Sequence, residues 1–207
     1  MPELPLNMRP KNNPMKLCAV LLAAGASRRF GPDNKLLARL PDGQLLAQAA
    51  ALPLVQTLEQ VIAVVRPGEQ QLAELLQQSG CQICWHERAD AGMGSSLAKG
   101  VSAAANFDGW LVSLADMPYL RPSSVLQVAD ALRAGAAMAR PIHRGKAGHP
   151  VGFSARFGPQ LQALDDDHGA RSIISAAPHL LQKIDCDDPA VLHDIDTLDD
   201  LAQLHQR

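Results

Sequence analysis

Residues Lys16–Ala23 form an uninterrupted apolar run (KLCAVLLA) that stops at a segment rich in Gly, Ser and Arg. Two shorter runs, Gln60–Val65 and Trp110–Leu114, likewise end in turns. A strand that is apolar throughout is typical of a parallel sheet covered by helices on both faces. The three runs therefore predict buried strands of such a sheet.

Stretches with helical spacing lie between and after these runs. Apolar residues recur at three- and four-residue intervals in Leu45–Leu58, Glu69–Gln78, Ser95–Ala105 and Ser123–Ala134. Alternation of strand and helix is the βαβ pattern, whose crossovers are right-handed. The sequence thus predicts a three-layer α/β/α domain with a mostly parallel sheet.

The pattern becomes less regular after Gly135. The elements expected there are a loop over His143–His149, a strand over Pro150–Phe153, short helices over Ala155–Leu164 and Ala170–Ala176, a strand near His193–Ile195 and a helix from Asp199 onward. For a chain of 207 residues we expect a lead-in over residues 1–15 and a single domain over residues 16–207.

Bulk composition narrows the classes of function. The formal net charge of -2 argues against a nucleic-acid binder, which needs a basic surface. No apolar run approaches the roughly 20 residues that cross a bilayer, and the N-terminal segment lacks the apolar region of a signal peptide. Four scattered cysteines are too few for a disulfide scaffold. We therefore expect a cytoplasmic protein that binds neither nucleic acid nor membranes.

The turn after the first apolar run is the most informative segment for function. It reads Leu22–Gly31 (LAAGASRRFG) and is followed by Lys35. Ligands of α/β sheets collect at the carboxyl ends of the strands, and small residues let the backbone approach phosphate oxygens closely. Arg28, Arg29 and Lys35 add the positive charge that a triphosphate requires. The turn therefore predicts a phosphate-binding loop.

This turn matches neither of two better-known phosphate loops. The Walker pattern needs Gly-Lys-Ser/Thr, whereas Gly31 is followed by Pro32. The pattern G-x-G-x-x-G fails because Gly25 is followed by Ala26-Ser27. An ordinary turn with solvated arginines is the alternative interpretation, and three cations within eight residues favour the phosphate loop.

Several later segments have to be considered together with this turn. They are Gly92–Leu97 followed by Gly100, Leu114–Leu120 with its D-x-P, Gly148–Pro150, Asp167–Arg171, and Asp194–Thr197 followed by Asp199–Leu201. With LAAGASRRFG and Lys35, they resemble in content and order the nucleotidyltransferases that include the molybdenum cofactor guanylyl- and cytidylyltransferases (MobA/MocA-like). The resemblance covers the chain from about Leu17 to its end and implies a Rossmann-like nucleotidyltransferase fold. One position departs from it, because Asp166 stands where the family usually has Gly.

The resemblance also implies roles for individual residues. It assigns catalysis to Arg29, Lys35 and Asp116. It assigns nucleotide binding to Leu22, Ala23, Ala24, Gly25, Ser27, Arg28, Arg29, Lys35, Gly94, Ser95 and Ser96. It assigns acceptor binding to His149, Pro150 and Arg171. Arg140 belongs to the basic stretch that ends at His149, a candidate cradle for the acceptor's phosphate.

Asp116 is the candidate metal anchor. It lies two residues beyond the run Trp110–Leu114, where the end of a strand would hold it over the nucleotide. Mg²⁺ prefers one or two carboxylates together with waters and phosphate oxygens, although a lone Asp before Met-Pro is otherwise a turn former. Asp194 and Asp196 are candidates for a second metal carboxylate, and each could equally cap the last helix.

Ala24 bears on the choice of base. In the resemblance, guanylyltransferases have Gly-Gly after Leu-Ala where cytidylyl- and uridylyltransferases have Ala-Gly, and a methyl group under the base leaves less room for a purine. Ala24 therefore indicates a pyrimidine, unless it simply packs in the core, and the overall resemblance favours cytosine over uracil. The expected reaction is therefore transfer of CMP from CTP to the phosphorylated molybdopterin cofactor with Mg²⁺, and a molybdoenzyme or its maturation factor is a further expected partner.

Other functions stay open at this point. They are transfer of another nucleotide such as GTP or UTP, transfer to another phosphorylated acceptor, and a carrier that holds the cofactor without catalysis. A pure carrier has no need for the set Arg29, Lys35 and Asp116, which favours the enzyme. The missing G-x-G-x-x-G disfavours an NAD-dependent oxidoreductase.

Overall fold

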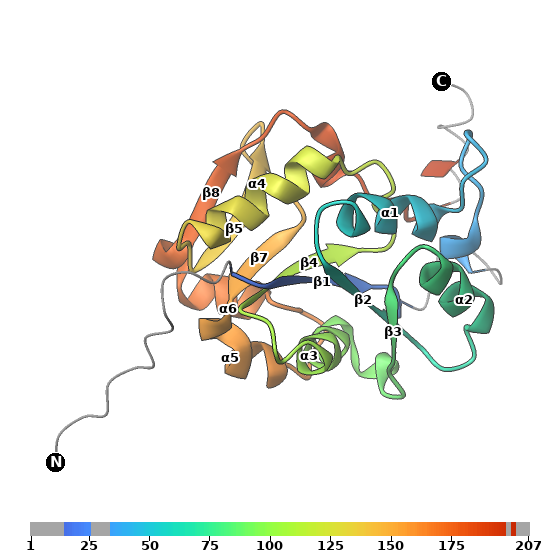
Figure 1. The fold of residues 1–207 in the computed structure, drawn as a ribbon, viewed down its shortest axis with the longest axis horizontal. Helices are drawn as coiled ribbons and strands as arrows, with labels where there is room; N and C mark the ends of the chain where they lie inside the picture. Colours follow the sequence, from blue (N-terminus) through green and yellow to red (C-terminus); the bar gives the residue numbers. More distant parts are fainter. Residues whose placement is uncertain (1–14, 26–33, 198–199, 202–207) are drawn as a thin grey trace, which may run out of the picture.

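The computed structural model describes residues 15–25, 34–197 and 200–201, which form a mixed sheet with helices on both faces (Figure 1). The strands are β1 (Leu17–Leu22), β2 (Gln60–Val65), β3 (Gln82–Trp85), β4 (Gly109–Leu114), β5 (Met138–His143), β6 (Lys146–Ala147), β7 (Val151–Ser154) and β8 (Leu181–Asp185). The α-helices are α1 (Leu46–Val55), α2 (Gln70–Gln78), α3 (Met93–Ala103), α4 (Pro122–Arg133), α5 (Gly158–Gln162) and α6 (Arg171–Ala176).

The sheet has the order β3-β2-β1-β4-β7-β5-β6, and β8 also pairs with β5. The four strands β3, β2, β1 and β4 are parallel, while β7 runs antiparallel to β4 and β5. This arrangement confirms the predicted three-layer α/β/α fold with a mostly parallel sheet.

The side chains of β1 explain why helices are needed on both faces. Leu17, Ala19 and Leu21 belong to one apolar core, with α1, α2 and α4. Cys18 and Val20 point to the opposite core, with α3, α5 and α6. Since alternate side chains of a strand point to opposite faces, a strand that is apolar throughout has to be covered twice.

Most predicted elements are present, but two predictions beyond Gly135 are wrong. The expected loop over His143–His149 contains a hairpin, since β5 extends to His143 and pairs with β6. The last strand is β8, not a segment near His193–Ile195, and the outer position of β8 beside β5 leaves most of its residues exposed. Strands of mixed polarity escape a search for apolar runs. The helix expected from Asp199 lies mostly outside the described residues, although Asp200 and Leu201 are helical.

The two central strands end at the same level. Leu22 of β1 is paired with Leu114 of β4, and the ladder continues one step because the Ala115 N–H donates to the Leu22 carbonyl over 3.1 Å. The residues after β1 and β4 therefore meet at one edge of the sheet, which is where the sequence placed the phosphate loop and Asp116.

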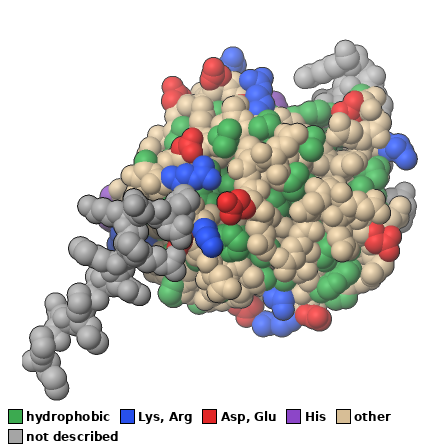
Figure 2. Space-filling view, viewed as in Figure 1, with side chains coloured by type: hydrophobic (Ala, Val, Ile, Leu, Met, Phe, Trp, Pro, Cys, Tyr) green, Lys and Arg blue, Asp and Glu red, His purple; other side chains and the backbone are tan. Residues whose placement is uncertain are grey.

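The surface is of mixed character on the face shown in Figure 2, where acidic and basic side chains are dispersed among polar and apolar ones. Within the described part of the chain, no helix is long and apolar enough to cross a membrane.

Gly100 allows α3 to pack closely on the sheet. A Cβ atom at this position would overlap the Val20 side chain and lie 2.8 Å from Cγ2 of Val64. We expect Gly100→Ala to lower the free energy of unfolding by about 1–3 kcal/mol despite the better helix propensity of Ala, because the well-packed core would have to shift. Ser102→Ala, on the exposed side of α3, should change it by less than about 0.5 kcal/mol. Equal urea midpoints for the two variants would show that the close packing does not matter.

Candidate active site at the carboxyl edge of the sheet

The Lys35 ammonium group lies between two carboxylates at this edge. Its Nζ is 2.8 Å from Oδ2 of Asp116 and 2.8 Å from Oδ1 of Asp196, and it also donates to the Ile195 carbonyl over 3.0 Å. Lys35 begins the short 3-10 helix η1 (Lys35–Leu37), which Asn34 caps by accepting from the Leu36 N–H. Three segments remote in sequence thus converge on one ammonium group.

Lys35 is charged in this setting. Burial acts to lower its pKa, but the hydrogen bonds and negative charges of Asp116 and Asp196 outweigh burial, so that the pKa lies above its ordinary value. A buried ammonium group that stays protonated requires such partners. The three side chains together therefore form a charged cluster at neutral pH.

One oxygen of Asp116 remains available for a ligand. Its Oδ2 binds Lys35, whereas its Oδ1 is buried and has no hydrogen-bond partner among the described residues. Leaving a buried carboxylate oxygen unpaired is costly. Mg²⁺ and similar cations accept one or two carboxylates and complete their shell with water and phosphate oxygens. The donor set of Asp116 and Asp196 fits a divalent cation.

The structure separates the two candidates for the second carboxylate. Asp196 is paired with Lys35, while Asp194 is exposed and is not part of this cluster. Among the described residues at the start of the last helix, Thr197 and Asp200 form a reciprocal cap in which Asp200 accepts from the Thr197 N–H over 2.8 Å and Thr197 Oγ1 accepts from the Asp200 N–H over 3.1 Å. A metal role for Asp194 or Asp196 stays a prediction, and the geometry favours Asp196.

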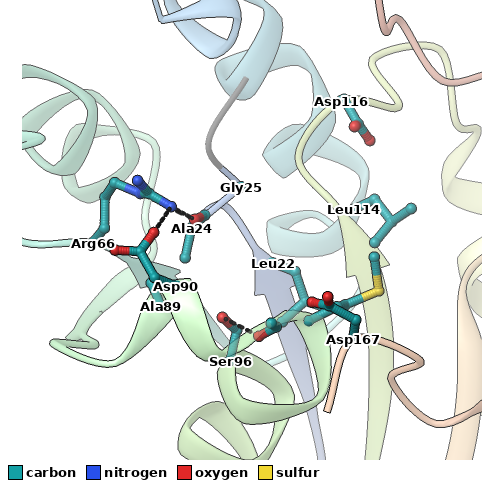
Figure 3. Close-up of a pocket in the computed structure, with 12 residues that line it drawn as sticks. Leu22, Ala24, Gly25, Arg66, Ala89, Asp90, Ser96, Leu114, Asp116 and Asp167 are labelled. Atoms are coloured by element: carbon teal, nitrogen blue, oxygen red, sulfur yellow. Dashed lines mark hydrogen bonds and ion pairs between the residues drawn. The ribbon is translucent and has the colours of Figure 1, made fainter. Parts of the chain in front are cut away.

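A cleft of about 370 Å³ opens beside this cluster (Figure 3). It is lined by Leu22, Ala24, Gly25, Arg66, Ala89, Asp90, Gly92, Met93, Ser96, Leu114, Asp116 and Asp167. Five of the residues that the sequence predicts for nucleotide binding or catalysis therefore lie in its wall, namely Leu22, Ala24, Gly25, Ser96 and Asp116. Ala23 is buried beside it, and Ser27, Arg28 and Arg29 lie outside the described residues.

Arg66 is a wall residue that the sequence reasoning missed. Its guanidinium group donates two hydrogen bonds to the Ala24 carbonyl, from Nε over 3.1 Å and from Nη2 over 2.8 Å, and Nη2 is 3.4 Å from Oδ1 of Asp90. Arg66 directly follows β2, so the rule that places ligands at the carboxyl ends of strands could have found it.

The N-terminus of α3 is only partly turned toward the cleft. Ser96 lines it, whereas the Ser95 hydroxyl lies in the interior, 2.8 Å from Nε2 of His86. The Gly94 N–H donates to the Asp166 carbonyl over 2.7 Å, and Asp166 Oδ1 accepts from the His168 N–H. Asp166 has no positive φ, so an Asp fits where the family usually has Gly. Nucleotide binding by Gly94 and Ser95 stays a prediction.

A second cavity, of about 450 Å³, adjoins the cleft. The two share Leu22, Met93 and Leu114 as lining residues. Its floor is apolar, with Val112, Val151 and Phe153, and its basic groups are Arg140, His149, His168 and Arg171. Two of the three predicted acceptor-binding residues, His149 and Arg171, thus line one cavity, and Pro150 is buried next to His149.

His149 is neutral in this cavity. Burial lowers its pKa to about 4, with the positive charge of Arg140 acting in the same direction. Its Nδ1 atom is buried and has no hydrogen-bond partner in the described part of the chain. The guanidinium group of Arg140 donates two hydrogen bonds to the Gly148 carbonyl, which fixes its position beside the imidazole.

The sequence and the fold both have known relatives. Residues 19–182 match the family described as the MobA-like NTP transferase domain. Over 195 residues the chain is 30% identical to nicotine blue oxidoreductase of Paenarthrobacter nicotinovorans, a similarity that covers 89% of this chain and 94% of that protein.

Solved structures share the architecture. Rv0371c from Mycobacterium tuberculosis H37Rv has a TM-score of 0.81 at 23% identity, covering 94% of this chain and 100% of that chain. The complex of Rv0371c with manganese has a TM-score of 0.77 at 22% identity, covering 92% and 98%. A nucleotidyl transferase from Methanothermobacter thermautotroptrophicus has a TM-score of 0.77 at 20% identity, covering 92% and 96%. These likenesses bear out the Rossmann-like nucleotidyltransferase fold.

The neutral His149 makes stability depend on pH. Between about pH 6.5 and about pH 4 the unfolded chain binds a proton at this imidazole that the native protein does not. The contribution of the neutral imidazole to the free energy of unfolding is therefore complete above the unfolded pKa. It decreases as the pH is lowered through this window, by about 3 kcal/mol in total. We expect urea unfolding of wild type and of His149→Asn to show a stability difference that changes by most of this amount from pH 7 to pH 4.5. Parallel curves for the two proteins would contradict the assignment.

Proposed function

The chain belongs to the MobA-like NTP transferase domain family, and from this premise we propose that it transfers CMP from CTP to the phosphorylated molybdopterin cofactor and releases pyrophosphate, with Mg²⁺ as its metal. Nucleotidyl transfer is the activity that the description of the family names. The cytidine donor, the pterin acceptor and the choice of Mg²⁺ are the parts that are proposed here.

The observation that carries the proposal is the position of Lys35, Asp116 and Asp196 at the edge of the nucleotide cleft, with a second cavity next to it. Transfer between two substrates needs two sites whose reacting groups meet. The lining residues shared by the two cavities, Leu22 and Leu114 among them, supply this contiguity. Holding both reactants in line accounts for much of the catalysis in such reactions.

In the proposed reaction an oxygen of the acceptor phosphate attacks the α-phosphorus of CTP, and the bond from that phosphorus to the pyrophosphate oxygen breaks. Lys35 lies beside the cleft and supplies a fixed positive charge for the triphosphate. Asp116 and Asp196 would hold the divalent cation, which when bound supplies neutralisation of the phosphate charge. The manganese in the structure of Rv0371c supports a metal requirement.

The second cavity suits a flat acceptor with an anionic group. Its apolar floor offers contact to a ring system, and the guanidinium groups of Arg140 and Arg171 offer charged donors to a phosphate. His149 stays neutral beside them, so that it adds a hydrogen-bonding group and no further charge. This composition supports a phosphorylated pterin as the acceptor.

The name of the relative from Paenarthrobacter nicotinovorans makes oxidoreduction of nicotine blue a second candidate function, favoured by the 30% identity over nearly the whole chain. An ammonium group between two carboxylates, with Oδ1 of Asp116 unpartnered among the described residues, suits a triphosphate and its cation and thereby favours nucleotidyl transfer. A non-catalytic carrier of the cofactor is disfavoured for the same reason.

The deciding experiment is pyrophosphate release from CTP, GTP, UTP and ATP with Mg²⁺ or Mn²⁺, with and without molybdopterin cofactor, beside NADH oxidation with nicotine blue. Release from CTP that depends on the cofactor is the expected result. Cofactor binding without release would support the carrier, and NADH oxidation without release would support the oxidoreductase.

Asp116 tests the metal site. We expect Asp116→Asn to lower kcat/KM for CTP by at least about 100-fold, because the amide keeps the size of the side chain but loses the charge that a cation requires. Asp185→Asn, on the exposed side of β8, should leave kcat/KM unchanged. Metal-dependent turnover near the wild-type level in Asp116→Asn would remove Asp116 as the metal anchor.

Ala24 tests the choice of base. Its methyl group is buried at the wall of the nucleotide cleft. We expect Ala24→Gly to reduce the preference for CTP over GTP, measured as the ratio of kcat/KM values, by about tenfold, the usual scale for one methyl group in a pocket. The preference for CTP over UTP should persist, since both bases are pyrimidines. An unchanged CTP/GTP ratio would show that the methyl group does not select the base.

A further inference from the structure

The connection between β2 and α2 is a tight turn with the sequence Arg66-Pro67-Gly68-Glu69. The Glu69 N–H donates to the Arg66 carbonyl over 3.4 Å, and Gly68 has a positive φ of 91°. Pro at the second position and Gly with positive φ at the third are the signature of a type II turn. Because Pro67 is fixed in φ and Gly68 fits without strain, the turn holds its first and last residues at a defined separation.

The first residue of this turn binds one end of the nucleotide loop. Arg66 donates two hydrogen bonds to the Ala24 carbonyl, as described above. Ala24 is the last residue but one before the segment of residues 26–33 that lies outside the described ranges. A guanidinium group with two bonds to one carbonyl restrains both the position and the orientation of that peptide.

The last residue of the turn binds the other end of the loop. Oε2 of Glu69 accepts a hydrogen bond from Nδ2 of Asn34 over 2.7 Å. Asn34 in turn accepts from the Leu36 N–H over 2.9 Å and thereby caps η1, the helical turn that begins with Lys35. A chain of short contacts therefore leads from Glu69 through Asn34 to the backbone that carries Lys35.

We propose that the turn Arg66–Glu69 is a clamp for the nucleotide loop, in which Arg66 positions Ala24 and Glu69 positions Lys35 by way of Asn34. The role in binding rests on the proposed function, since it needs a nucleotide in the cleft. Both are positioning residues. Arg66 acts through the Ala24 carbonyl, and Glu69, which is not among the residues that line the cleft, acts through Asn34.

The clamp holds Ala24 and Lys35 in place before a triphosphate binds. Groups that are already held in position lose less conformational freedom on binding than groups that are free. The ammonium group of Lys35 also needs a fixed direction to act on a phosphate. We therefore expect changes in the turn to weaken binding of the nucleotide and to leave binding of the acceptor unchanged.

Glu69 allows a test with matched variants. Glu69→Ala removes the contact to Asn34, and Glu69→Gln keeps an acceptor oxygen. Glu74→Ala removes a negative charge from the exposed side of α2, the helix that follows the turn. We expect Glu69→Ala to weaken CTP binding with Mg²⁺ about five- to tenfold by calorimetry, which is the scale of the loss of one hydrogen bond. Glu69→Gln should bind within about twofold of wild type, as should Glu74→Ala. The KM for the acceptor should be the same in all four proteins.

A double-mutant cycle tests the route through Asn34. If Glu69 acts by way of Asn34, adding Glu69→Ala to Asn34→Ala has no further effect on CTP binding. Additive effects of the two changes, or equal CTP binding by Glu69→Ala and wild type, would overturn the proposal.

Amide hydrogen exchange separates the clamp from the proposed function. The N–H groups of Leu36, Leu37 and Ala38 donate to Asn34 or to the Lys35 carbonyl, so their exchange without nucleotide should be faster in Glu69→Ala than in Glu74→Ala. If the wild-type protein binds none of the four nucleotides, the proposed function fails, and this exchange alone decides on the clamp. Unchanged exchange in Glu69→Ala would overturn it.

Discussion

The site depends on one ion cluster, in which the ammonium group of Lys35 joins Asp116 and Asp196 at 2.8 Å each. These residues come from three parts of the chain: the segment after the nucleotide loop, the end of the central strand β4 and the C-terminal segment. Without the ammonium group two carboxylates would face each other at the edge of the sheet, which is unfavourable in a partly buried place. The cluster thus ties the C-terminal segment to the sheet and places charge at the cleft.

The second constraint is that two cavities share a wall. The loop between α5 and α6 packs on the start of α3, where a Cβ atom at Gly94 would lie 2.7 Å from the Asp166 carbonyl. Asp167 of this loop lines the cleft beside Asp116, while His168 and Gly169 line the second cavity. One short loop therefore contributes to both sites, and the close approach explains why a residue without a side chain is needed at position 94.

Much of the parallel half of the fold could be predicted because β1, β2 and β4 are buried on both faces and are apolar apart from Gln60 and Ser113. The antiparallel half could not, since β5 includes Arg140 and Pro141 and β8 is mostly exposed. The same difference holds for the site. Asp116 has a recognisable motif around it, whereas Arg66 and Glu69 act through a turn whose contacts to Ala24 and Asn34 exist only when β1 and β2 lie side by side.

The pattern of residues along the chain was sufficient for the layered architecture and for placing the candidate phosphate loop and Asp116 directly after two neighbouring strands, because each depends on local periodicity or on a short motif. Tertiary structure alone decided that Asp196 and not Asp194 pairs with Lys35, that Ser95 turns inward to His86 while Ser96 lines the cleft, and that Arg140 joins His149 in one cavity. Each of these depends on which groups from distant segments come within hydrogen-bonding distance, and no spacing along the sequence specifies that distance.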